Sequence, residues 1–193
     1  RSYAACHFDY VSFYSAVFTL NRNWVLDFCK RNQSQGVKFH WKCVTTIDCL
    51  DEELIEEMGR SGCLRIGIGL ESLLVQTKQY LIKSKHVTLS TVRNLAEFCH
   101  KNGIELNCFI MVGFPGESSE DIINMLKQLK GITYLRVRPT VYTPYEDIKM
   151  YDNIRSAYRF NRQIMTSGID SSDEQKMYKC LYRDQNYNKS IYS

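Results

Sequence analysis

The chain has 193 residues, enough for one domain or for part of a larger one. Hydrophobic residues make up 44% and charged residues 24%, an ordinary globular composition that excludes a disordered or fibrous chain. The net charge of +4 includes no block of like charges, so it gives no ground to expect a nucleic-acid partner. No apolar run approaches the roughly 20 residues that a membrane-spanning helix needs, so we expect no membrane partner.

The cysteines and the chain start bear on metal binding and location. None of the eight cysteines forms a CxxC or CxxxCxxC spacing, so the sequence encodes no local zinc or iron–sulphur loop. The sequence begins at Arg1 without a methionine or a signal peptide, and we interpret the start as cut. Without a secretion signal, we expect reduced thiols and a cytoplasmic protein.

The first half of the chain alternates between strand and helix patterns. The patterns predict a strand at 8–14, a helix at 21–31, a strand at 37–46, a helix at 51–62 and a strand at 64–70. Three carboxylates begin the 51–62 segment, where they suit the positive end of a helix dipole.

The second half continues the alternation. It predicts a short helix near 73–82, a helix at 89–103, a strand at 104–112, a helix after Ser118, a strand at 133–142 broken by Pro139, and a helix at 150–168. Ser118 and Asp121 have the spacing of a capping box. The polar, tyrosine-rich tail at 169–193 gives no clear pattern.

Strands separated by helices predict parallel pairing through right-handed crossovers, and therefore an α/β fold, either a barrel or an open sheet. In both, ligands bind at the carboxyl ends of the strands. These ends form a rim at 45–48, 69–72, 113–117 and 143–145. We expect the glycines after 112 to leave backbone amides accessible to a ligand, next to the start of a helix.

Five segments resemble, in order, radical S-adenosylmethionine (SAM) enzymes: "FYSAVFTLNRNWVLDFC", "FHWKCVTTIDCLDEELIEEMGRSGC", "LRIGIGLES", "CFIMVGFPGES" and "TPY". The most similar subgroup often carries a cobalamin-binding domain, and the resemblance covers about 8–145. It implies a partial (βα) barrel of six units, of which this chain has about five strands and lacks the first unit with its CxxxCxxC loop. The implied domains are a truncated barrel at 1–149 and a helical and polar C-terminal extension at 150–193.

The resemblance implies the C-terminal portion of a radical SAM enzyme, with SAM binding and adenosyl-radical chemistry on a small-molecule substrate. A 4Fe-4S cluster would then come only from an N-terminal segment, cobalamin would belong to the full-length protein, and this segment alone would be inactive. Ser15-Ala16 replaces an acidic pair that is usual in the subgroup, and Thr46 replaces a common arginine. These departures support the alternative, a degenerate non-catalytic relative that binds a nucleotide-like ligand or a partner protein.

The resemblance also nominates site residues. Those for the cofactor are Glu71, Ser72, Gly113, Phe114, Pro115 and Gly116. The alternatives are a helix cap at Glu71 and Ser72 and a tight turn at the glycines, and Glu117 is interpreted as a first-turn helix acid. Strand alternation, rather than the resemblance, suggests the substrate residues. Trp41 and Cys43 share a face that could line the barrel cavity or pack in the core. Arg136 and Arg138 share a face that could reach an anionic substrate or carry surface charge. Strict alternation places His40 on the opposite face, under a helix. No catalytic residue or metal ligand is assigned.

The strand at 8–14 would lose its neighbour if the first unit is absent. Exposed apolar strand edges recruit other strands, and Asp9 is the only charge in this segment. We therefore expect self-association, or a partner strand, at 8–14. The alternative is that residues 1–7, or the tyrosine-rich tail, fold over this edge and cover it.

Overall fold

The computed structural model describes residues 10–34, 39–78, 86–114, 117–142, 158–161 and 164–167. They belong to two compact units. Unit 1 comprises Arg1–Leu70, His86–Phe109 and Leu129–Arg138, and unit 2 comprises Glu71–Lys85, Ile110–Gln128 and Pro139–Ser193. Each unit is described separately. Within the described ranges, no helix is both long and apolar enough to cross a membrane.

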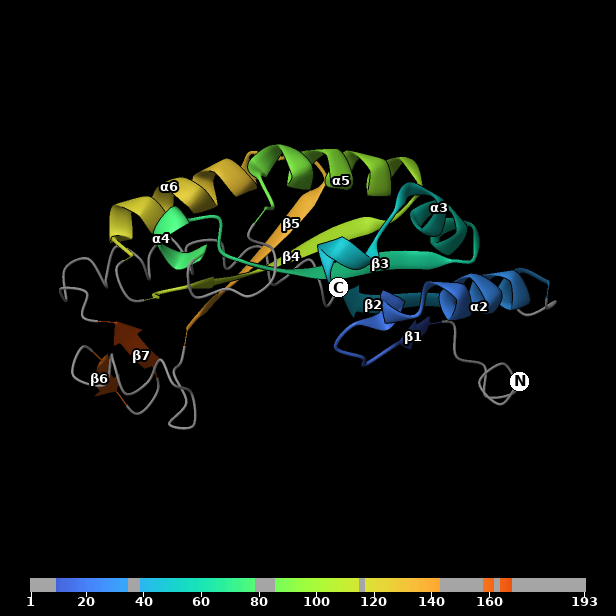
Figure 1. Ribbon diagram of the computed structural model, residues 1–193, viewed down its shortest axis with the longest axis horizontal. Coiled ribbons are helices and arrows are strands. Elements are labelled where there is room, and N and C mark those ends of the chain that lie inside the picture. The colour runs from blue at the N-terminus through green and yellow to red at the C-terminus, as the bar shows by residue number, and fades with distance from the viewer. Residues whose placement is uncertain are drawn as a thin grey trace. The chain divides into compact units, whose positions relative to one another are not determined.

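A five-stranded parallel sheet confirms the predicted α/β class (Figure 1). Its strands, in spatial as well as chain order, are β1 (Tyr10–Ser12), β2 (His40–Thr45), β3 (Cys63–Glu71), β4 (Glu105–Val112) and β5 (Leu135–Val141). β1 pairs only with β2, in the register Val11 to Trp41. The strand predicted at 8–14 is therefore an edge strand in the described part of the sheet.

The helices follow the predicted alternation. They are α2 (Arg22–Ser34), α3 (Glu52–Arg60), α4 (Val75–Lys78), α5 (Leu89–Lys101) and α6 (Ser119–Lys130), with short 3-10 turns η1 (Phe18–Leu20) and η2 (Ile47–Cys49). The side chain of Asp51 caps α3 by accepting from the Leu54 amide at 2.8 Å. Ser118 Oγ accepts from the Asp121 amide at 3.1 Å and donates to the Asp121 carboxylate at 2.8 Å. The predicted pairing of Ser118 with Asp121 is thus confirmed.

Two predicted features are wrong. Pro139 does not break β5, which runs through it. Proline lacks an N–H donor but is tolerated at a sheet edge, and β5 is the last strand in the order. The helix predicted at 150–168 is replaced, where it is described, by an antiparallel hairpin of β6 (Tyr158–Asn161) and β7 (Ile164–Ser167). Short apolar segments do not distinguish helix from strand by periodicity alone. The tail at 169–193 lies outside the described residues.

The core of unit 1 contains an aromatic cluster against β2. Trp41 is fully buried, and its ring centroid lies 5.8, 5.4 and 5.3 Å from those of Phe13, Phe18 and Phe28. Such separations are typical of favourable aromatic pairs. Its indole nitrogen donates to the Ser61 carbonyl at 3.2 Å, which satisfies the buried N–H. This cluster fixes which face of the sheet packs against helices.

The opposite face of the sheet in unit 1 is open. On β2, Trp41, Cys43 and Thr45 are buried whereas His40 and Val44 are exposed. The expectation that His40 packs under a helix is therefore wrong, because the cluster around Trp41 occupies the helix side. On β3 and β4 the same alternation leaves Arg65 and Phe109 only partly buried.

Candidate functional site

The turn after β4, within unit 2, is organised by one buried carboxylate. Glu117 is 6% exposed. Its Oε2 accepts from the backbone amides of Gly113 at 2.7 Å and Phe114 at 3.1 Å. Its Oε1 accepts from the hydroxyls of Ser72 at 3.3 Å and Thr77. Glu117 therefore ties the Gly113 turn to the segment that follows β3.

These contacts correct two expectations. The amides of Gly113 and Phe114 are not accessible to a ligand, because Glu117 accepts from both. Glu117 is not a first-turn helix acid either, since it precedes the Ser118 cap and points into the unit. Sequence reasoning missed this role, although the position of Glu117 before the cap already placed it outside α6.

Burial raises the pKa of Glu117 above its usual value, and the hydrogen bonds from Thr77, Gly113, Phe114 and Ser72 offset part of that rise. The four donors are the arrangement that a buried carboxylate requires. The carboxylate of Glu117 is therefore occupied by hydrogen bonds within the protein, and its role is to hold the Gly113 turn.

Glu71, the last residue of β3, has a different environment. Its backbone is left-handed, with φ 63°, a conformation that costs a residue other than glycine about 1–3 kcal/mol. Its side chain is half-buried, and desolvation raises the pKa of its carboxyl. Among the described residues, no hydrogen bond or ion pair to this carboxylate is found. Strained residues with unsatisfied side chains are typical of binding sites.

The other described residues that were predicted for the cofactor, Ser72, Gly113 and Phe114, have structural contacts. Ser72 is completely buried, and its hydroxyl also accepts from the Leu74 amide at 3.2 Å. Gly113 has φ 89°, which explains the glycine there. Phe114 is buried and stacks on Tyr142, with ring centroids 4.4 Å apart. Pro115 and Gly116 lie outside the described residues. Binding roles for all these residues stay predictions.

The structure divides the residues predicted for the substrate: Cys43 and Arg138 both line the pocket described below, whereas Trp41 and Arg136 do not. Trp41 and Cys43 are 0% and 3% exposed, in the core on the helix side. Arg136 and Arg138 are on β5 and only partly buried. Arg136 Nε lies 3.3 Å from Glu105 Oε1, and Arg65 Nε lies 2.8 Å from the same oxygen. The Nε–Oε1 contact of Arg65 is an ion pair, and Arg65 Nη2 also donates to Glu105 Oε2 at 3.5 Å.

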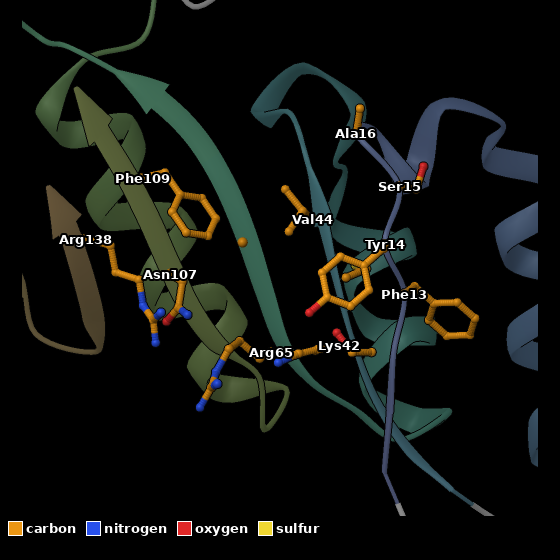
Figure 2. A pocket seen from close by; sticks show the side chains of 13 residues that line it. Phe13, Tyr14, Ser15, Ala16, Lys42, Val44, Arg65, Asn107, Phe109 and Arg138 are labelled. Atoms are coloured by element: carbon orange, nitrogen blue, oxygen red, sulfur yellow. The ribbon is translucent and has the colours of Figure 1, made fainter. Parts of the chain in front are cut away.

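A pocket of about 400 Å³ lies on the open face of unit 1 (Figure 2). Its lining comes from β1 and the turn after it and from all four other strands, and it includes Lys42, Val44, Arg65, Asn107, Phe109 and Arg138. Three of the lining residues are cations and none is an acid. Asn107 is 4% exposed, and no partner for its Oδ1 is found among the described residues. Sequence reasoning missed Lys42, Asn107 and Phe109; a polar Asn107 inside the apolar run of 104–112 was the available signal.

The described cysteines do not form a metal centre. No group of three or more His, Cys, Asp or Glu side chains that could hold a metal ion occurs in the described ranges. A cysteine binds a metal ion as its thiolate. Burial disfavours that form here, because it raises the pKa of the Cys99 thiol to about 12 and the pKa of the Cys63 thiol well above its usual value. These residues do not fit a 4Fe-4S cluster, and they pack as small hydrophobic side chains.

Five parallel strands in one sheet, connected through helices, define a partial α/β barrel. The profile of the Radical SAM superfamily matches residues 4–129, more than half of the chain, and the chain belongs to that superfamily.

Related proteins agree with this assignment. A curated relative, an uncharacterized methyltransferase of Pyrococcus horikoshii, is 22% identical over 150 residues, which are 76% of this chain and 32% of the relative. The chain thus spans about a third of that relative's length.

Solved structures share the fold. The radical SAM methyltransferase TsrM from Kitasatospora setae, with cobalamin and a [4Fe-4S] cluster bound, is 15% identical with a TM-score of 0.62, over 72% of this chain and 29% of TsrM. Coproporphyrinogen III oxidase (HemN) from Escherichia coli is 14% identical with a TM-score of 0.59, over 79% of this chain and 41% of HemN. The cobalamin-dependent radical SAM enzyme OxsB, with aqua-cobalamin bound, is 14% identical with a TM-score of 0.54, over 94% of this chain and 24% of OxsB.

Proposed function

We propose that the 193 residues of this chain supply the SAM-binding rim and the substrate-facing sheet of a cobalamin-dependent radical SAM enzyme that transfers a methyl group. Family membership and the methyltransferase name of the curated relative support the reaction class. The binding of cobalamin by TsrM and OxsB supports the cofactor. Within the chain itself, the observation that carries the proposal is Glu71.

Glu71 fits SAM better than it fits a structural role. Its half-buried carboxylate has no partner among the described residues, and the protein retains a strained backbone at this position. A carboxylate is a good acceptor for an ammonium group and for ribose hydroxyls, both of which SAM carries. Glu117 supports the neighbouring Gly113 turn by fixing its conformation before any ligand arrives.

Bound SAM would supply a methyl group or an adenosyl radical. The residues of this chain would bind and orient it: Glu71 as a hydrogen-bond acceptor, beside the Gly113 turn that Glu117 holds in place. The cysteines described above do not fit the cluster that the reaction needs, so no step through a cluster is assigned to them.

The test compares SAM binding and SAM conversion in the full natural polypeptide, reconstituted anaerobically, with Glu71→Gln and with the control Glu97→Gln. Glu97 is exposed on α5 in unit 1, and its substitution makes the same change in charge. We expect Glu71→Gln to weaken SAM binding by about 10–100-fold, because it removes a charge-assisted hydrogen bond, and Glu97→Gln to leave it unchanged. Equal SAM affinity in all three proteins would refute the role of Glu71. SAM binding without any conversion would instead support the non-catalytic alternative.

A further inference from the structure

We infer that the pocket of unit 1 binds a small carboxylate that has an apolar body and a hydroxyl or N–H donor. The inference names the substrate class of the proposed enzyme and rests on that function. Its test measures ligand binding alone, so the inferred ligand class and the proposed function can fail separately.

The charge of the pocket selects an anion. Lys42, Arg65 and Arg138 line it, and no carboxylate does. Glu105 lies outside the lining and pairs with Arg65 and Arg136, so it neutralises part of this charge. No acidic partner for Lys42 or Arg138 is found among the described residues. Guanidinium and ammonium groups bind carboxylates through charge-assisted hydrogen bonds.

Asn107 adds a requirement for a donor. It lies on β4, which neighbours β5 with Arg138, and Figure 2 shows both side chains at the same side of the pocket. Its Oδ1 accepts only, and leaving such a buried atom without a partner costs free energy. A hydroxyl or N–H on the ligand would satisfy it. A ligand that lacks a donor would not.

The remaining lining is mainly apolar, with side-chain hydroxyls from Ser12, Tyr14 and Ser15. The rings of Phe109 and Tyr14 lie on opposite sides of the pocket, with Val44 between them (Figure 2). Tyr14 is 97% exposed, so its ring has room to move onto a bound molecule. A Cβ at Gly67 would lie 2.7 Å from the Phe109 ring, so glycine at this position leaves room for that ring. A volume of about 400 Å³ is in the range of small-molecule sites.

The probe is 3-phenyllactate, which combines a carboxylate, a hydroxyl and an aromatic body. Two matched compounds each lack one feature: 3-phenyllactamide lacks the charge, and 3-phenylpropionate lacks the hydroxyl. Calorimetric titration of the full natural polypeptide, without a reductant, measures binding in the absence of turnover. We expect 3-phenyllactate to bind at millimolar concentrations or below, and the amide to bind at least about tenfold more weakly.

Variants locate the binding site. We expect Arg138→Met to weaken 3-phenyllactate binding by about 10–100-fold, and Lys101→Met, an exposed change of equal charge on α5, to have no effect. We expect Asn107→Leu to abolish the preference for 3-phenyllactate over 3-phenylpropionate. Undetectable binding of 3-phenyllactate, or equal binding of its amide, overturns the inference even if a variant fails to fold. SAM binding that survives such a result would leave the proposed function intact.

Discussion

Replacing Glu117 by alanine tests how the rim is held together. The substitution removes the acceptor for two backbone amides, Gly113 and Phe114, and for two hydroxyls, Ser72 and Thr77. All four donors lie in unit 2 with Glu117. The hydroxyls can rotate toward other acceptors, whereas the amides are fixed by the backbone.

The magnitude follows from the two amides. Each buried donor left without a partner costs about 1–3 kcal/mol, so the two together cost about 2–6 kcal/mol. Removing the buried carboxylate also removes its desolvation penalty, which is large enough to raise its pKa. The net expectation is a loss of about 2–4 kcal/mol in the free energy of unfolding.

Glu117→Gln is the matched control. Its amide oxygen can accept from Gly113 and Phe114 while its NH₂ group donates to the hydroxyls, so we expect it to fold with a smaller loss. Urea unfolding gives the free energies, and hydrogen exchange at the Gly113 and Phe114 amides reports the turn itself. An alanine variant within about 0.5 kcal/mol of the wild type, with both amides still protected, would refute the reasoning.

The same residue predicts a pH dependence. Because burial raises the folded-state pKa of Glu117 above its ordinary 4.5, the folded state holds this proton more tightly than the unfolded state does. The contribution of Glu117 to stability is therefore fully present below pH 4.5 and is lost as pH rises through the raised pKa. We expect the stability of the wild type relative to Glu117→Gln to fall as pH rises across this window. A difference that instead grows with pH would show that the hydrogen bonds outweigh desolvation.

Three further perturbations test the fold and its edges. Gly59→Ala in α3 should destabilise the protein by about 1–3 kcal/mol despite the better helix propensity of alanine, because the new Cβ would lie 2.5 Å from the Asn102 carbonyl oxygen; stabilisation in urea unfolding would contradict this. Anaerobic reconstitution of the 193-residue chain should give no stoichiometric iron–sulphur cluster, and a clean four-iron spectrum that disappears on substitution of its cysteines would overturn that expectation. Tyr10→Lys, at the 41% exposed start of β1, should reduce concentration-dependent association in sedimentation, and unchanged association would exclude this edge as the contact.

The sequence predicted the order of the elements because periodicity and capping are local properties. Asp51 and Ser118 marked helix starts through side chains that bond within three residues. By contrast, the faces of β2 could not be assigned from alternation alone, because it gives two sets of residues without saying which set meets the helices. Long-range packing of Phe18 and Phe28 onto Trp41 decides that, and it leaves His40 exposed.

The candidate site was predictable only in outline. The GFPGE motif identified the turn, but not that its acid bonds back onto its own amides, because that depends on a burial which no spacing reveals. The pocket combines side chains from five separate strands, and their convergence depends on strand register. Asn107 was recognisable as a polar residue within an apolar strand, yet only the structure shows its Oδ1 without a partner.

Glu71 provides the sharpest separation between stability and function. Its left-handed backbone, φ 63°, is a conformation that glycine adopts without strain, so Glu71→Gly should relieve roughly 1–2 kcal/mol of native-state strain. Glycine also increases the conformational entropy of the unfolded chain, which offsets part of the stabilisation. We therefore expect the free energy of unfolding to rise by about 0.5–1 kcal/mol. The same substitution removes the carboxylate, so SAM affinity should fall as in Glu71→Gln. A purely structural residue would not give higher stability together with lower SAM affinity. A Glu71→Gly variant that loses stability and keeps its SAM affinity would therefore identify Glu71 as a structural residue and refute its assignment to the rim.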